Sequence, residues 1–265
     1  MTTNATMREM PDEGGTRPIP FLSCFFPAFN EEESIGGVLD EALATLPRFA
    51  DRFEVIVVDD GSTDDTAKVV SAAAESAGHD VVRLVSHEVN SGYGEALRSG
   101  LNAARGDAVF FTDADRQFHL EDIAKLLDRY GETPFVVGYR LKRNDPRHRL
   151  FVARVYHAVL KAVFGLRVRD VDCAFKLMER DALERIRPSL ESRSAFISPE
   201  LLIRAQTAGF RIAEVGVPHY PRAAGRPKGA TPKVIARTIG EIFKMRRRLG
   251  TASERQAETE TNRLP

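Results

Sequence analysis

The sequence predicts an α/β fold with a mostly parallel central sheet flanked by helices. Short runs rich in β-branched and aromatic residues alternate with helical stretches of about ten to fifteen residues. Such alternation is typical of βαβ units, whose right-handed crossovers place helices on the faces of the sheet. The chain has 265 residues, 43% of them hydrophobic and 29% charged, so it is long and apolar enough to bury a normal core.

The expected elements follow the chain in order. Compact apolar runs that end at polar or glycine-containing turns mark the strands, and apolar residues at helical spacing mark the helices. The expected strands are 20–26, 53–58, 81–86, 108–112 and 135–138. The expected helices are 34–49, 65–77, 94–105, 120–130, 150–164, 199–207 and 231–249, with Ser198 and Thr231 as N-terminal caps of the last two.

Composition excludes several classes of protein. No window approaches eighteen uncharged apolar residues, so no membrane-spanning helix is expected, and the polar N-terminus lacks the apolar region of a secretory signal. Two cysteines, Cys24 and Cys173, cannot make a disulfide framework, which favours a reducing cytosol. We expect one domain over 20–249, with disordered tails at 1–19 and 250–265.

The net charge of zero hides an uneven distribution. Residues 1–137 contain 11 basic against 25 acidic residues, whereas residues 138–249 contain 25 basic against 10 acidic ones. An acidic half can hold a metal ion and a basic half can hold phosphate groups. Chance scatter of solvated charge is the alternative. The basic half lacks interleaved aromatic residues and any nucleic-acid-reading module, so a nucleic-acid partner is not expected.

Acidic clusters follow three of the expected strands. They are 30–33, 59–60 and 113–115, and the carboxyl ends of parallel strands meet at one edge of a sheet, where ligands bind. Like charges gathered there need a cation or another compensating ligand. Asp113 and Asp115, here called the Asp pair, can bridge Mg²⁺ or Mn²⁺ to a diphosphate, with Gln117 as a further oxygen ligand. An isolated Asp-x-Asp would more often be a solvated turn.

In this context the chain resembles glycosyltransferase family 2, and within it the polyprenyl-phosphate sugar synthases related to dolichol-phosphate mannose synthase. The resemblance covers about residues 20–248 and implies the GT-A fold, a Rossmann-like nucleotide-sugar fold. The chain differs from many members in having Tyr93 in place of lysine and Ala174 in place of glycine. The matching blocks are FPAFNEE from 26, EVIVVDDGSTDDT from 54, NSGYGEAL from 90, TDADRQ from 112, VDCAFK from 171, SPELL from 198 and HYPRAAG from 219.

The resemblance implies roles for several of the matching residues in the donor half, 20–137. The donor is a UDP- or GDP-linked hexose, and Asp60 accepts hydrogen bonds from its base. The Asp pair and Gln117 bind Mg²⁺ or Mn²⁺, and these three residues with Arg222 make up the catalytic set. The implied nucleotide-sugar-binding residues are Pro27, Ala28, Phe29, Asn30, Glu31, Asp59, Asp60, Gly94, Asp113, Ala114 and Asp115.

In the acceptor half, 138–249, the resemblance implies that arginines hold a polyprenyl or dolichyl phosphate. The implied acceptor-phosphate residues are Arg140, Arg154, Arg222 and Lys228. A planar guanidinium suits this task because it grips phosphate with two parallel hydrogen bonds. A phosphomonoester is already anionic, so it can attack the sugar with inversion and without the general base that an alcohol acceptor needs.

Two further features leave alternatives open. Glu200 is either the base of an enzyme that glycosylates a soluble or protein hydroxyl, or an acid that stabilises a helix N-terminus. The C-terminal helix carries basic and apolar faces, which suit either an anionic membrane surface or packing on the sheet. We expect a peripheral enzyme on the cytoplasmic face of the membrane, docked on lipid or on a membrane-embedded partner. A catalytically silent nucleotide-sugar-binding protein is a further alternative.

Overall fold

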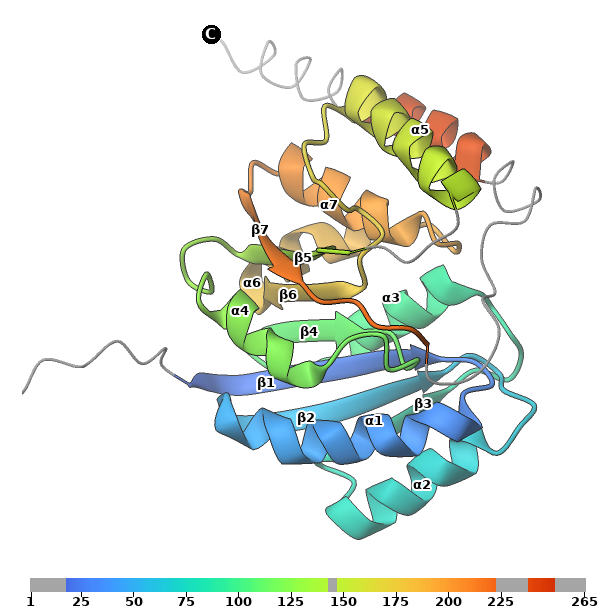
Figure 1. Ribbon diagram of the computed structural model, residues 1–265, viewed down its shortest axis with the longest axis vertical. Coiled ribbons are helices and arrows are strands. Elements are labelled where there is room, and N and C mark those ends of the chain that lie inside the picture. Colours follow the sequence, from blue (N-terminus) through green and yellow to red (C-terminus); the bar gives the residue numbers. More distant parts are fainter. Residues whose placement is uncertain (1–17, 143–146, 223–237, 251–265) are drawn as a thin grey trace, which may run out of the picture.

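The computed structural model describes residues 18–142, 147–222 and 238–250, and its centre is a mostly parallel sheet (Figure 1). The seven strands of these residues follow the order β3-β2-β1-β4-β6-β5-β7. Strand β6 is antiparallel to both of its neighbours, and the other pairs are parallel. The strands are β1 (Ile19–Ala28), β2 (Ala50–Asp59), β3 (Val82–Ser86), β4 (Ala108–Thr112), β5 (Phe135–Arg140), β6 (Phe175–Glu179) and β7 (Ile212–Val217).

Helices cover both faces of the sheet, as the alternating pattern predicts. Helices α1, α2 and α4 contribute to one buried apolar cluster, and α3, α6 and α7 contribute to a second one. Two further parts of the chain, α5 and the helical segment 238–250, lie side by side beyond α7 (Figure 1). The helices are α1 (Glu32–Thr45), α2 (Thr66–Ala77), α3 (Tyr93–Ala103), α4 (Ile123–Leu127), α5 (Arg147–Phe164), α6 (Arg180–Ile186) and α7 (Ile197–Thr207).

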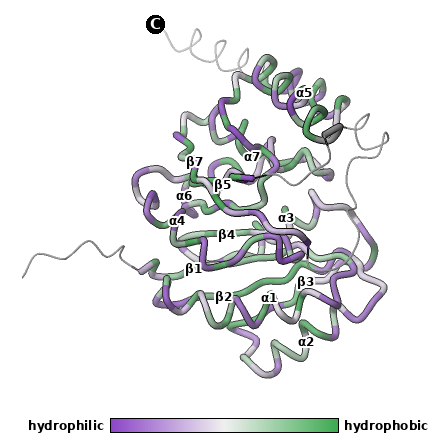
Figure 2. Tube along the Cα trace, viewed as in Figure 1, coloured by the Kyte–Doolittle hydropathy of each residue, from purple (hydrophilic) through white to green (hydrophobic). Residues whose placement is uncertain are grey.

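The central strands are apolar along most of their length because both of their faces are buried. In β1, Cys24 and Phe26 join the first cluster, whereas Phe25 points to the second and stacks on Phe111 of β4 at 5.2 Å between ring centroids. Figure 2 shows the resulting hydrophobic colouring of β1, β2 and β4. The core therefore holds the carboxyl ends of these strands in fixed positions at one edge.

The expected helices differ from the observed ones at several boundaries. The expected helix 34–49 ends at Thr45, because Pro47 cannot continue the helical hydrogen bonding, and a short 3-10 turn, η1 (Leu46–Arg48), leads directly into β2. The expected helix 120–130 is only the turn η2 (Leu120–Asp122) and the short α4. Ser198 is not a cap, because α7 already begins at Ile197.

The sequence pattern missed β6, β7 and α6. Strand β6 is hidden in the sequence because Lys176 interrupts its apolar run, although this lysine is fully buried in the structure. Strand β7 contains Glu214 and Gly216, and its residues are mostly half-buried. Both strands form through pairing with distant partners, β4 and β5. Such pairing leaves little local signal.

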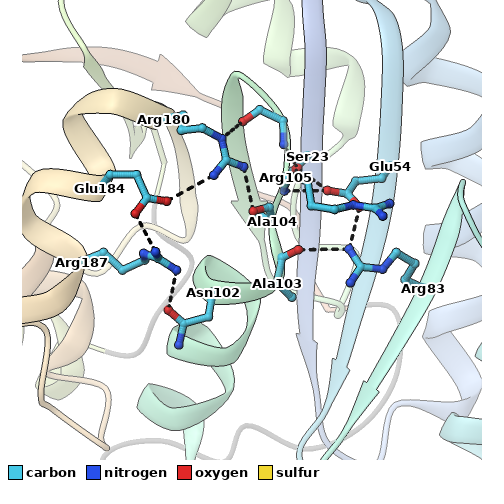
Figure 3. A network of polar contacts seen from close by, with 11 residues as sticks. Ser23, Glu54, Arg83, Asn102, Ala103, Ala104, Arg105, Arg180, Glu184 and Arg187 are labelled. Atoms are coloured by element: carbon cyan, nitrogen blue, oxygen red, sulfur yellow. Dashed lines mark hydrogen bonds and ion pairs between the residues drawn. The ribbon is translucent and has the colours of Figure 1, made fainter.

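The amino ends of the central strands carry a polar network (Figure 3). Glu54 of β2 is fully buried and accepts hydrogen bonds from Ser23 Oγ (2.6 Å), Arg83 Nη1 (2.8 Å) and the Arg105 backbone N–H (2.8 Å). Burial alone would raise the pKa of Glu54, but these hydrogen bonds leave it below its usual value. The network holds the turn before β4, which contains Arg105, against β1 and β2.

A third apolar cluster joins α5, α7 and the segment 238–250. Ile242 and Met245 of that segment are buried against residues that include Leu160 and Leu202. Within the described residues, no helix is both long and apolar enough to cross a bilayer. The cap Thr231, Lys228 and the expected tails, apart from residues 18–19 and 250, lie outside the described residues. Ile19, expected in the N-terminal tail, is the first residue of β1 and is buried, and residue 250 belongs to the helical segment 238–250.

Candidate active site

The Asp pair lies immediately after β4, at the carboxyl edge of the sheet. Asp113 is half-buried and Asp115 is buried. Tyr93, at the start of α3, donates its hydroxyl to Asp113 Oδ1 at 3.0 Å. Arg222 follows β7 in the chain, and its Nη2 lies 2.7 Å from Asp115 Oδ2 while its Nη1 lies 3.4 Å from Glu31 Oε1. Residues from three other, distant parts of the sequence therefore meet around the pair.

The pair carries more negative charge than its neighbours compensate. Burial and the charge of Asp115 raise the pKa of Asp113 to about 7, against the opposing effects of Tyr93, Arg222 and Lys176. Burial also raises the pKa of Asp115, although the charge of Arg222 opposes it. Two close carboxylates with raised pKa values are a site where an added cation is favourable.

The residues of the pair fit a divalent cation by this chemistry. Carboxylate oxygens are the preferred ligands of Mg²⁺ and Mn²⁺, and in nucleotide sites the diphosphate and water complete the coordination. No group of three or more His, Cys, Asp or Glu side chains placed to hold a metal occurs within the described residues. The side-chain amide nitrogen of Gln117 donates to the Tyr220 carbonyl at 3.1 Å, which keeps Gln117 beside the pair.

Asp59 and Asp60, at the end of β2, organise two loops of the same edge. Asp59 Oδ1 accepts the Ser62 N–H at 3.1 Å. Asp60 is buried, and its two oxygens accept the backbone N–H groups of Ser91 (2.8 Å) and Gly92 (2.9 Å). His87 Nδ1 lies 2.7 Å from Asp60 Oδ1. A nucleotide base that donated a hydrogen bond to Asp60 would therefore share the carboxylate oxygens of Asp60 with these backbone N–H groups and with His87.

The first predicted block, 27–31, crosses from β1 into α1. Pro27 and Ala28 are buried in the strand, Phe29 is half-buried, and Asn30 is exposed with a left-handed backbone of φ 51°. Asn30 Oδ1 accepts the Thr63 N–H at 2.8 Å, so this block is tied to the loop after β2. Ala114 is buried between the two members of the Asp pair.

Gly94 is required by a close backbone approach. A Cβ built on Gly94 would lie 2.5 Å from the carbonyl carbon of Arg193 and 2.6 Å from the carbonyl oxygens of Ser192 and Ser194. The segment 191–194 therefore packs directly on the first turn of α3, beside Tyr93. A glycine at this position lets the two backbones touch.

Glu200 holds that same segment in place. It is 2% exposed, and its Oε2 accepts the backbone N–H groups of Glu191 (3.2 Å) and Ser192 (2.8 Å). Its Oε1 lies 3.5 Å from Arg204 Nη2. Both carboxylate oxygens are thus engaged inside the protein, which favours the structural interpretation of Glu200 over that of a base.

The arginines expected on the acceptor side lie in different environments. Arg140, at the end of β5, donates from Nε and Nη2 to the two carboxylate oxygens of Asp170 at 2.6 and 2.8 Å. Arg154 is exposed on α5. Arg222 contacts the Asp pair rather than Arg140. The structure does not bring these three arginines together into one contact.

Sequence reasoning missed two residues of this edge, Lys176 and Asp170. Lys176 is fully buried beneath the site, and burial lowers the pKa of its ammonium group. Its Nζ donates to Ser198 Oγ (2.8 Å) and to the carbonyl oxygens of Val171 (3.3 Å) and Cys173. A lysine inside an apolar run was the available signal, since a fully buried lysine needs partners.

The chain is similar to several known proteins. Residues 23–187 match the model of a family described as glycosyl transferase family 2. Glycosyltransferase AglD of Haloferax volcanii is 33% identical over 226 residues, which cover 82% of this chain and 35% of that protein. Undecaprenyl-phosphate 4-deoxy-4-formamido-L-arabinose transferase of Serratia proteamaculans is 32% identical over 221 residues, 82% of this chain and 65% of that protein.

A solved structure is similar as well. It is glucosyl-3-phosphoglycerate synthase from Mycobacterium tuberculosis in complex with Mn²⁺, uridine diphosphate and phosphoglyceric acid. Its TM-score is 0.62 at 27% identity, with 78% of this chain and 72% of that chain covered. This chain spans about a third to two thirds of the length of the two curated relatives above.

Proposed function

The chain belongs to glycosyl transferase family 2, and from this premise we propose that it transfers a hexose from a nucleotide-diphosphate sugar to a polyprenyl phosphate. The expected GT-A fold is confirmed by the structural likeness. The observation that carries the proposal is the Asp pair, whose negative charge is only partly compensated at the carboxyl edge of the sheet. The names of the curated relatives support a lipid-phosphate acceptor and leave the base, UDP or GDP, to experiment.

Asp113 and Asp115 would hold Mg²⁺ or Mn²⁺, with Gln117 beside them. When bound, the cation supplies positive charge to the departing diphosphate. Arg222 already lies 2.7 Å from Asp115, so its guanidinium is close enough to contribute charge to the same group. The protein's own contribution is the paired strands β1, β2 and β4, which position the loops that carry these charged groups before the reaction begins.

An anionic acceptor would need positive charge and no base. Arg140 and Arg154 are the residues that we propose for this task, with Lys228 as a further cation. Asp170 orients Arg140 through two short hydrogen bonds and leaves part of its fork for a phosphate. An acceptor oxygen that is already ionised attacks the sugar directly, so the reaction inverts the anomeric centre.

A soluble acceptor is the second candidate, and one observation favours it. The similar synthase from Mycobacterium tuberculosis has phosphoglyceric acid in its complex, a small molecule that carries both a phosphate and a hydroxyl. A hydroxyl acceptor needs a general base. Glu200 is poorly suited to that role here, because its oxygens accept backbone hydrogen bonds in a buried position.

To reach a lipid acceptor, the protein must also bind the membrane surface, and we propose that it binds the cytoplasmic face. Six of the nine exposed large hydrophobic side chains of the described residues lie on α5 and the segment 238–250, and helix α5 alternates hydrophobic and hydrophilic residues (Figure 2). Exposed basic residues, among them Arg154 and Lys244, lie on the same two helices. This combination suits an anionic bilayer. The six side chains are Phe151, Val152, Val155, Val159, Ile239 and Phe243.

A donor and acceptor panel tests the proposal. UDP-glucose, UDP-GlcNAc, UDP-GalNAc, UDP-galactose and GDP-mannose are supplied with Mg²⁺ or Mn²⁺, and nucleotide release is measured with polyprenyl phosphate in detergent, with phosphoglyceric acid, or without acceptor. Release that needs both the lipid and an intact Asp115 supports the proposal. Release with phosphoglyceric acid alone favours the soluble acceptor. Binding of a sugar nucleotide without release under any condition favours the silent binding protein.

The membrane part has its own measurement. Co-sedimentation with vesicles that contain phosphatidylglycerol should exceed that with pure phosphatidylcholine vesicles, and Phe243→Glu should reduce it several-fold. Equal sedimentation with both kinds of vesicle would contradict the role of the basic residues. Unchanged sedimentation of the variant would contradict the role of the apolar ones.

A further inference from the structure

One carboxylate at the carboxyl edge, that of Asp172, belongs neither to the Asp pair nor to the proposed acceptor-phosphate residues. Residues 170–176 form a buried stretch in which Asp172 is the single exposed residue. Its neighbour Asp170 is neutralised by Arg140, whereas no hydrogen bond to the Asp172 carboxylate is present within the described residues. Because the residues on both sides of Asp172 are buried, the fold itself keeps the Asp172 side chain exposed.

The backbone on both sides of Asp172 is fixed from beneath. Lys176 Nζ donates to the carbonyl oxygens of Val171 and Cys173, the two residues that flank Asp172. Ser198 Oγ donates to the same Val171 carbonyl at 2.8 Å. A fully buried lysine that satisfies these carbonyls makes the loop rigid, so the position of the Asp172 carboxylate is preorganised.

The sheet places this loop between the two halves of the site. Strand β6 is antiparallel, and its first residue, Phe175, pairs with Thr112 at the end of β4. On its other side, Lys176 pairs with Val137 of β5, the strand that ends at Arg140. The residues before Phe175 therefore lie at the edge to which β4 brings the Asp pair and β5 brings Arg140.

The charges around Asp172 agree with this placement. Asp172 interacts electrostatically with Tyr93, which contacts Asp113 on the donor side. Burial and the neighbouring charge of Asp170 raise the pKa of Asp172. The charges of His157 of α5 and of Arg140, both on the acceptor side, oppose this rise. Asp172 thus belongs to the acceptor half of the chain and is near residues of both halves.

In the proposed reaction, the transferred sugar lies between the donor side and the acceptor side of the site, near Asp172. The carbon that is transferred is bonded first to the donor diphosphate and then to the acceptor, so the sugar must lie between two anionic groups. A carboxylate there repels both phosphates, but it accepts hydrogen bonds from hydroxyl groups. We propose that Asp172 binds hydroxyl groups of the transferred sugar and so selects the donor; this inference rests on the proposed function.

Binding measurements separate this role from a structural one. Titration calorimetry with Mn²⁺ compares the wild type and Asp172→Asn, first with UDP and GDP and then with the five sugar nucleotides of the donor panel. Asparagine keeps the shape of the side chain but removes the charged acceptor. We expect the affinity for the preferred sugar nucleotide to fall about tenfold or more, because hydrogen bonds to charged groups are strong. The affinity for the parent nucleoside diphosphate, which lacks the sugar, should change by no more than about twofold.

Two variants serve as controls. Asp172→Glu retains the charge and should recover part of the lost affinity. Asp181→Asn removes an exposed carboxylate at the start of α6, which follows the far end of β6, and should leave both affinities unchanged. Unchanged binding of the nucleoside diphosphate also verifies that each variant is folded.

Each other outcome overturns the inference. Equal weakening of both kinds of ligand would make Asp172 a structural residue, and no change for either would remove it from the sugar site. A wild type that binds nucleoside diphosphates and sugar nucleotides but transfers no sugar would refute the proposed function instead. A wild type that binds no sugar nucleotide would refute both.

Discussion

The two edges of the sheet carry similar residues in opposite electrostatic states. At the amino edge, Glu54 accepts hydrogen bonds from a serine and two arginines, and its pKa is held below the usual value (Figure 3). At the carboxyl edge, burial and Asp115 raise the pKa of Asp113 to about 7. The carboxylates of Glu54 and Asp113 are both partly or fully buried and both lie near an arginine. Only the negative charge of Glu54 is fully compensated by its partners. The comparison indicates that a satisfied network holds the fold and an unsatisfied one is prepared for a ligand.

The largest effect is expected when one member of the Asp pair is replaced. Asp115→Asn should lower kcat roughly 100- to 1,000-fold, because it removes charge from the site that stabilises the leaving diphosphate. The thermal unfolding midpoint should change little, since the substitution also relieves repulsion with Asp113. Steady-state kinetics and calorimetry measure both effects. Loss of folding together with activity would show that the carboxyl edge is structural too.

The opposite result is expected at the amino edge. Glu54→Gln should destabilise the protein by about 3 kcal/mol, at the low end for a broken buried ion pair, because Arg83 and Arg105 still reach solvent. Denaturant unfolding measures the change. The variant should retain wild-type kcat under conditions where it is folded, and a large loss of kcat in the folded variant would connect the two edges.

The two edges should also differ in their pH dependence. Asp113 binds its proton more tightly in the folded than in the unfolded protein, so its contribution to stability is favourable at low pH and is lost as the pH rises from about 4 to about 7. Glu54 has a lowered pKa, so its contribution is lost in the other direction, as the pH falls through its folded value. Urea midpoints of the wild type and Asp113→Asn between pH 4 and 8 test this. The variant should lack the decline between about 4 and 7, and two parallel profiles would contradict the raised pKa.

The smallest effect is expected for an ion pair that belongs to neither edge. Arg48 and Glu121 lie 2.8 Å apart, but their side chains are 59% and 68% exposed. Arg48→Ala should change the free energy of unfolding by less than about 1 kcal/mol and leave activity unchanged. The same unfolding assay provides the baseline against which the effect of Glu54→Gln is judged. A larger value would mean that exposure is a poor guide to these pairs.

The sequence predicted the donor side of the molecule well. Strands β1, β2 and β4 are buried on both faces, so their apolar runs stand out from the flanking polar turns, and the acidic residues that follow them mark the ligand edge. The acceptor side was harder. Strand β6 contains Lys176, β7 contains Glu214, and both are stabilised by pairing with distant strands rather than by local propensity.

The sequence alone determined the α/β class, the order of the first strands along the chain and the location of the Asp pair directly after one of them. It could do so because periodicity and turn residues act over short distances. Only the tertiary structure decided how residues distant in the chain meet. It placed Arg222 beside Asp115, and it left Asp172 exposed at the carboxyl edge. It also placed the backbone N–H of Ser192 on the carboxylate of Glu200. The position of Asp172 depends on the antiparallel insertion of β6 into the sheet, because Asp172 lies three residues before the start of that strand. That insertion arises from long-range pairing and burial, which no local stretch of sequence records.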